Sequence, residues 1–88
     1  MIFITFGKWR KKPTKEMVAQ ATKLFEQMVK EGIKIHGQYW LLGRYDVVTI
    51  LDAKDEKTLM KAGLRWGDLF STETLLALPR EEAIKLVE

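Results

Sequence analysis

The chain has 88 residues, a formal net charge of +3 and no cysteine. A chain of this length has room for one hydrophobic core, so we expect a single domain over residues 1–88. The lack of cysteine excludes disulfides, thiolate metal sites and a cysteine nucleophile. The mild charge gives little support to a nucleic-acid or membrane partner.

Residues 2–9 are β-branched and aromatic, and they stop at a basic cluster, which predicts a first strand. From Met17 onwards, apolar residues recur at helical spacing along one stripe. Thr14 offers an N-cap oxygen, so a helix is expected over residues 14–31. Gly32 is expected to end it, because the left-handed closing position favours glycine.

Residues 33–42 and 45–52 return to strand composition, which predicts a hairpin. Gly43 and Arg44 are expected to form its two-residue loop, since glycine in the first loop position suits a tight turn. This loop sets the register of the hairpin. The expected pairs are Leu42 with Tyr45, Trp40 with Val47, Gln38 with Thr49 and His36 with Leu51.

Asp55 is expected to cap a second, shorter helix that ends between Leu64 and Trp66. Residues 70–78 read as a fourth strand, and Pro79 is expected to start a short terminal helix. The order β-α-β-β-α-β is the split βαβ arrangement, an α+β fold. It places a four-stranded antiparallel sheet under two helices on one face.

The hairpin register predicts what lies on each sheet face. One face would pack on the helices and carry Ile35, Gly37, Tyr39, Leu41, Asp46, Val48, Ile50 and Asp52. The other face would stay open and carry Trp40, Leu42, Val47 and Leu51. So much apolar surface needs a cover, and an identical sheet supplies one by two-fold symmetry, so we expect a homodimer. A ligand space between the two sheets would be lined by His36, Gln38, Trp40 and Thr49.

The segment Tyr39–Val48 resembles the hallmark stretch of the GYD-domain family, which is named after residues that stand here as Gly43, Tyr45 and Asp46. The segments 6–9 and 71–75 are also similar to that family. The resemblance implies a dimeric α/β barrel with a ferredoxin-like fold and a largely uncharacterised function. The same hairpin is similar to the ligand-sensing domain of the leucine-responsive regulators, and this chain would then be the sensing half alone.

His36 is the only histidine, and a lone histidine on a strand is more often an interface residue than a catalyst. No metal site is expected, because no second histidine or carboxylate stands at ligand spacing. Tyr45 and Asp46 are neighbours on a strand and point to opposite faces, so they are expected to shape the fold. In that reading, Asp46 accepts N–H bonds from the turn and Tyr45 packs across the strands.

A basic turn could hold a phosphate or single-stranded nucleic acid beside Trp9, although a solvated loop explains it equally well. Its residues are Lys8, Arg10, Lys11, Lys12 and Lys15.

The leading functional hypothesis is a small-molecule-binding or sensing homodimer without a cofactor. The alternative is a cofactor-free monooxygenase-like or haem-handling enzyme of the dimeric α/β-barrel type, and a purely structural interaction module is third. Whether the chain is an enzyme stays open. The N-terminus lacks the features of a signal peptide, which favours the cytoplasm. The absence of asparagine and the wealth of charge suggest a heat-adapted source.

Overall fold

The computed structural model describes residues 1–88. Its elements follow the order expected from the sequence. The strands are β1 (Ile2–Trp9), β2 (Lys34–Trp40), β3 (Val47–Asp52) and β4 (Phe70–Ala77). The helices are α1 (Lys15–Lys30), α2 (Glu56–Gly63) and α3 (Arg80–Ala83), with single 3-10 turns η1 (Leu64–Trp66) and η2 (Ile84–Leu86).

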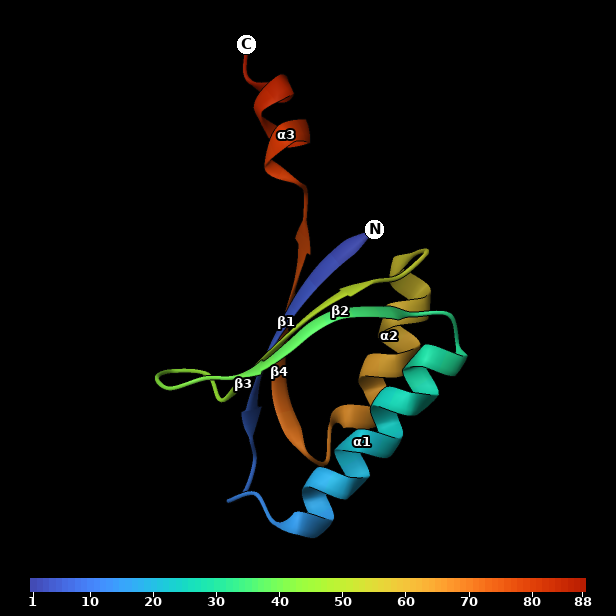
Figure 1. Ribbon diagram of the computed structural model, residues 1–88, viewed down its shortest axis with the longest axis vertical. Coiled ribbons are helices and arrows are strands. Elements are labelled where there is room, and N and C mark those ends of the chain that lie inside the picture. Colours follow the sequence, from blue (N-terminus) through green and yellow to red (C-terminus); the bar gives the residue numbers. More distant parts are fainter.

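The four strands form one antiparallel sheet in the order β2-β3-β1-β4. Figure 1 shows α1 and α2 side by side on one face of this sheet, while the opposite face carries no helix. The short α3 stands apart from both, beyond the end of β4. The predicted α+β fold, with its four-stranded antiparallel sheet and a short C-terminal helix, is therefore confirmed.

Local capping explains where the two main helices begin. The Thr14 hydroxyl accepts a hydrogen bond from the Met17 backbone N–H at 3.2 Å, and the Asp55 carboxylate accepts one from the Thr58 N–H at 2.8 Å. Each bond satisfies an amide that has no partner inside its helix. Gly32, with φ of +92°, ends the first helix as predicted.

A bidentate ion pair ties the end of α1 to η1. Arg65 Nη1 and Nη2 donate to the two Glu31 carboxylate oxygens at 2.5 and 2.7 Å. This pair holds the pKa of Glu31 at about 2, below its usual 4.5, chiefly through the hydrogen bond from Arg65. It also raises the pKa of Arg65. The two helical segments are thereby fixed to each other above the sheet.

The hydrophobic core lies between the sheet and the two helices. Phe3 of β1 and Leu51 of β3, which pair across the ladder, form its floor. Gly7 lies further along the same face, where an added Cβ would stand 2.8 Å from Val47 Cγ2. Its lack of a side chain lets Val47 and Phe70 close over the strand. The buried core residues are Phe3, Ala21, Met28, Ile33, Leu51, Ala53, Leu59, Ala62, Trp66, Leu69 and Phe70.

The predicted assignment of the two sheet faces is wrong. Leu51 is buried against the helices and Val47 packs beside it, whereas both were expected on the open face. The open face instead carries Val48 and Ile50, which were expected in the core. Alternation alone could not decide between the faces, because the hairpin carries apolar residues on both of them.

The predicted two-residue loop is also wrong. The strands end at Trp40 and resume at Val47, so residues 41–46 form the connection. Gly43 has φ of +122°, so the expected positive φ at this position is present although the loop is longer than expected. The Leu41 N–H donates to the Asp46 carbonyl at 2.7 Å and closes the loop. Leu42, expected to pair with Tyr45 on the open face, is fully exposed at the loop's tip.

The predicted pairs of Trp40 with Val47 and of Gln38 with Thr49 are confirmed. The ladder then shifts between Ile35 and Gly37, where His36 forms a β-bulge, so Leu51 pairs with Ile35 instead of His36. No helix of the chain combines the length and the apolar character needed to cross a membrane.

Candidate functional site

A row of polar residues crosses the whole sheet on the side that faces the helices. Thr5 of β1 pairs with Thr49 of β3 and with Thr74 of β4, and Thr49 pairs with Gln38 of β2. Residues directly opposite each other in a sheet point to the same face, about 4.8 Å apart from strand to strand. The four side chains therefore form one line, which we call the polar row: Gln38, Thr49, Thr5 and Thr74.

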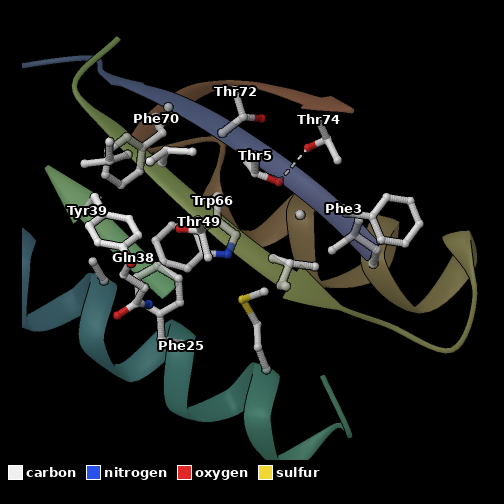
Figure 2. Close-up of a pocket in the computed structure, with 18 of the residues that line it drawn as sticks. Phe3, Thr5, Phe25, Gln38, Tyr39, Thr49, Trp66, Phe70, Thr72 and Thr74 are labelled. Carbon is white, nitrogen blue, oxygen red and sulfur yellow. Dashed lines mark hydrogen bonds between the residues drawn. The ribbon is translucent and has the colours of Figure 1, made fainter. Parts of the chain in front are cut away.

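The polar row lies inside a cavity of about 590 Å³ between the sheet and the helices. Figure 2 shows its four members together with Phe25, which comes from α1. The Thr5 and Thr74 hydroxyls form a hydrogen bond of 3.0 Å, drawn as a dashed line. Thr49 is buried, while Gln38 and Thr74, on the two edge strands, stay exposed. The cavity thus has a polar floor that is open at both edges of the sheet.

Aromatic side chains form a continuous cluster along the cavity wall. Trp9 packs on Phe70 with ring centroids 4.1 Å apart, and Trp40 meets Trp9 edge-on at 5.7 Å. Trp66 joins Phe70 to Phe25, at 5.8 and 4.5 Å respectively. The Trp9 Nε1–H is buried in this cluster without an acceptor. All five rings line the cavity, so its walls suit a flat apolar molecule.

Glu56, at the start of α2, is the ionisable lining residue on the helix side of the sheet. Tyr39 of β2 also borders the cavity, but it pairs with Val48 and its ring lies against Gly37, so its side chain is on the open face. The other polar lining groups are hydroxyls, an amide and indoles, which donate and accept hydrogen bonds without changing charge. The arrangement can therefore bind and orient a molecule over the polar row. Acid or base catalysis in the cavity would rest on Glu56.

The structure separates the four predicted ligand-binding residues. Gln38, Trp40 and Thr49 line the cavity together, so three of the four residues predicted from the sequence belong to one site. Their cavity lies between the sheet and the helices, however, and not on the open sheet face where a space between two sheets was expected. The reason is the inverted face assignment described above.

His36 lies apart from the cavity. It occupies the bulge near the far end of β2, and its Nε2 is 3.9 Å from Asp52 Oδ2. The Met1 amino group donates to Asp52 Oδ1 at 3.0 Å and lowers the pKa of that carboxyl. His36 thus belongs to a small surface charge group at the edge of the sheet. No cluster of three His, Asp or Glu side chains able to hold a metal ion is present.

The residues of the glycine-tyrosine-aspartate motif shape the hairpin. Asp46 accepts a hydrogen bond from the Trp9 backbone N–H, on β1, and not from the turn as expected. Tyr45 packs on Phe6 with ring centroids 4.9 Å apart, which confirms that it packs across the strands. Its hydroxyl donates to the Glu73 carboxylate, and this bond raises the pKa of Tyr45.

Two residues of the basic turn form hydrogen bonds with other parts of the chain. Arg10 Nε donates to the Gly67 carbonyl at 2.5 Å, and Lys8 Nζ donates to the Arg44 carbonyl at 3.5 Å. Lys11, Lys12 and Lys15 are exposed to solvent.

Sequence reasoning missed the contributions of β1 and β4 to the cavity. Thr5 and Thr74 lie in strands whose alternation is regular, but nothing in the sequence says which face the helices cover. Their register with Thr49 was the missing information, and it requires the β3-β1-β4 strand order. The lining from these two strands is Phe3, Thr5, Gly7, Trp9, Phe70, Thr72 and Thr74.

Comparison with known proteins gives a family match and several similar structures. The family model described as the GYD domain matches residues 3–87. No curated protein matches the chain. A dimeric ferredoxin-like protein of unknown function from Thermobifida fusca is 18% identical, with a TM-score of 0.52 over 88% of this chain and 89% of that chain.

Two enzymes share the same fold. A variant of SnoaB, a cofactor-independent oxygenase from Streptomyces nogalater, is 15% identical, with a TM-score of 0.55 over 90% of this chain and 91% of that chain. The 5-chloro-2-hydroxyhydroquinone dehydrochlorinase TftG from Burkholderia phenoliruptrix, solved with 2,5-dihydroxybenzoquinone, is 17% identical. Its TM-score is 0.58 over 93% of this chain and 98% of that chain. At these identities the likeness shows the fold.

Proposed function

Given that the chain belongs to the GYD-domain family, we propose that the protein is a homodimer that binds a small molecule in its helix–sheet cavity. The observation that carries the binding proposal is the polar row in a cavity with aromatic walls. Thr5 and Thr74 bond to each other, whereas the buried Trp9 Nε1–H in the cavity wall has no acceptor, and an unpaired buried polar group costs free energy. A ligand with matching groups would supply that acceptor and bond to the polar row while its apolar faces fill the rest of the space.

The chemistry of the lining favours one kind of ligand. Aromatic rings favour a flat molecule, and the row of hydroxyl and amide groups favours oxygen or nitrogen atoms along one edge of it. The lining has no lysine, arginine or histidine, which favours a neutral ligand over an anion. The TftG structure was solved with a molecule of this kind, because 2,5-dihydroxybenzoquinone is a flat ring with oxygen substituents.

Calorimetric titration with 1,4-naphthoquinone, a neutral flat molecule with two carbonyl oxygens, tests the binding proposal. The double variant Gln38→Leu with Thr49→Val should bind the probe about tenfold more weakly, since it removes two hydrogen-bonding groups at roughly 0.5–1.5 kcal/mol each. His36→Ala is the control and should bind as the unmodified protein does, because His36 lies outside the cavity. If His36→Ala loses affinity and the double variant keeps it, the helix–sheet cavity is not the site.

The dimer proposal is supported by the open sheet face. Ile4, Phe6, Val48 and Ile50 point away from the helices there, and Leu75 on β4 is 47% exposed. In all, 13 of 88 residues are buried, so much of the apolar surface of one copy is uncovered. An identical sheet covers such a face by two-fold symmetry. The similar protein from Thermobifida fusca is described as dimeric, in keeping with this arrangement.

Sedimentation equilibrium at micromolar concentration tests the dimer. We expect twice the chain mass of 10.2 kDa. Leu75→Glu should shift the population towards the monomer, because it places a charge in the sheet interface. Gln20→Glu, at an exposed position of α1 on the other side of the sheet, is the control and should leave the dimer intact. A single species of 10.2 kDa in the unmodified protein would contradict the homodimer.

A further inference from the structure

The last eleven residues, Leu78–Glu88, form a C-terminal arm that leaves the body of the protein. Figure 1 shows the arm continuing beyond the end of β4, away from α1 and α2. Within it, α3 packs against η2. The arm extends the molecule along its longest axis, which measures 49 Å against 31 Å for the next. It is therefore an isolated helical segment with little support from its own chain.

The arm is apolar where a solvated tail would be polar. Leu86 and Val87 are 72% and 80% exposed, and half or more of Leu78 and Ile84 is exposed as well. Helices of this length are not stable in water without tertiary packing, because the entropy lost on forming the first turn exceeds the stabilisation from their few hydrogen bonds. A short helix with exposed leucine, isoleucine and valine needs a surface to dock on.

The structure points to a second copy of the chain as that surface. The open sheet face runs along β4 through Leu75 to Ala77, the last residue of the strand, so the arm begins where the face of the proposed dimer ends. The charges agree with a docked arm. It carries three glutamates against one arginine and one lysine, while the chain as a whole has a net charge of +3, so the body is the more basic part.

We propose that the C-terminal arm of each copy docks through Ile84 and Leu86 on the body of the other copy. This proposal rests on the proposed homodimer and adds a second contact to it, outside the sheet interface. The arm then contributes apolar contacts that one copy alone cannot make. Its helix would form fully only in the dimer.

Two variants in the arm separate docking from mere exposure. Ile84→Gln with Leu86→Gln should weaken the dimer by about tenfold or more in sedimentation equilibrium, because two buried aliphatic side chains are lost. Lys85→Gln, between them, is the matched control and should leave the dissociation constant unchanged. Neither change touches the hydrophobic core, so the fold of the body is retained.

Trypsin cleavage at Arg80 reports whether the arm docks on its own copy or on another. An arm docked on a second copy becomes more susceptible when the protein is diluted below its dimer dissociation constant. An arm docked on its own body is cleaved at a rate independent of dilution, and that result would overturn the proposal. So would an unchanged dissociation constant in the glutamine double variant.

The outcomes also distinguish this proposal from the proposed function. If the unmodified protein stays at 10.2 kDa at micromolar concentration, the homodimer itself fails and the arm proposal fails with it. If the protein is a dimer but the arm variant dimerises equally well, only the arm proposal fails. Binding of 1,4-naphthoquinone is measured independently of both.

Discussion

The backbone N–H of Trp9 donates a hydrogen bond to Asp46 Oδ2 at 2.8 Å. It joins the last residue of β1 to the loop that precedes β3. The Asp46 N–H in turn donates to the Gly7 carbonyl at 2.9 Å, so the backbone and the side chain of Asp46 extend the β1–β3 ladder by one residue before the start of β3. The aspartate of the motif thereby holds the hairpin loop against the strand that carries Trp9 into the cavity wall.

Asp46→Ala should destabilise the fold by about 1–3 kcal/mol, because a partly buried backbone N–H loses a charged acceptor. Urea unfolding measures the change. Asp68→Ala removes an exposed carboxylate and serves as the control, with little expected effect. Equal unfolding midpoints for the two variants would show that the loop does not depend on this bond.

Gly43→Val should destabilise the fold by about 1–3 kcal/mol through backbone strain alone. Gly43 has φ of +122°, and a Cβ there would meet nothing within 4 Å, so no steric clash contributes. Gly63→Ala introduces no such strain, because Gly63 has a helical φ of −61° and a Cβ there would also meet nothing within 4 Å. It should stabilise the protein by about 0.5–1 kcal/mol. Thermal melts that rank the two variants in the reverse order would contradict the loop conformation.

The Glu31–Arg65 pair should make stability depend on pH in the acid range. The carboxyl has a pKa of about 2 in the folded chain and an ordinary value of 4.5. Because the folded pKa is the lower one, the stabilisation is complete above 4.5 and is lost as the pH falls through about 2. Denaturant unfolding over this range should show a steeper loss for the unmodified protein than for Glu31→Gln. Parallel curves would exclude the pair as a source of stability.

Tyr45 should ionise above the ordinary tyrosine pKa of 10.0, because its hydroxyl is hydrogen-bonded to the Glu73 carboxylate. Absorbance titration of the phenolate measures this pKa, and Tyr39→Phe removes the other tyrosine signal. Glu73→Gln should bring the pKa back towards 10.0. Identical titration curves with glutamate and with glutamine at position 73 would show that the side chains of Tyr45 and Glu73 do not interact.

Local signals in the sequence predicted the order of the elements and the capping of the two main helices well. Thr14, Asp55 and Gly32 act through their own backbone neighbours, and each was placed correctly. The pairing of Gln38 with Thr49 also followed from local hairpin geometry. Such features depend on residues within a few positions of one another, which a single sequence displays directly.

The sheet faces could not be predicted, because they depend on contacts far apart in the chain. Val47 and Val48 are equally apolar, and which of them meets the helices is decided by packing around Gly7 and Phe70. The polar row was hidden for the same reason. Thr49 is buried under the helices, where composition alone favours an apolar residue.

The bulge at His36 makes β2 one residue longer than its partner strand requires. On either side of it the pairs run in step, with Ile35 opposite Leu51 and Gly37 opposite Ile50. Removing His36 from the gene would join Ile35 to Gly37 and leave a regular ladder, with every existing pair kept. Among the residues of this strand, His36 is thus the one at which the chain can shorten without turning any neighbour to the opposite face. Relatives one residue shorter in this strand should show their alignment gap at this position.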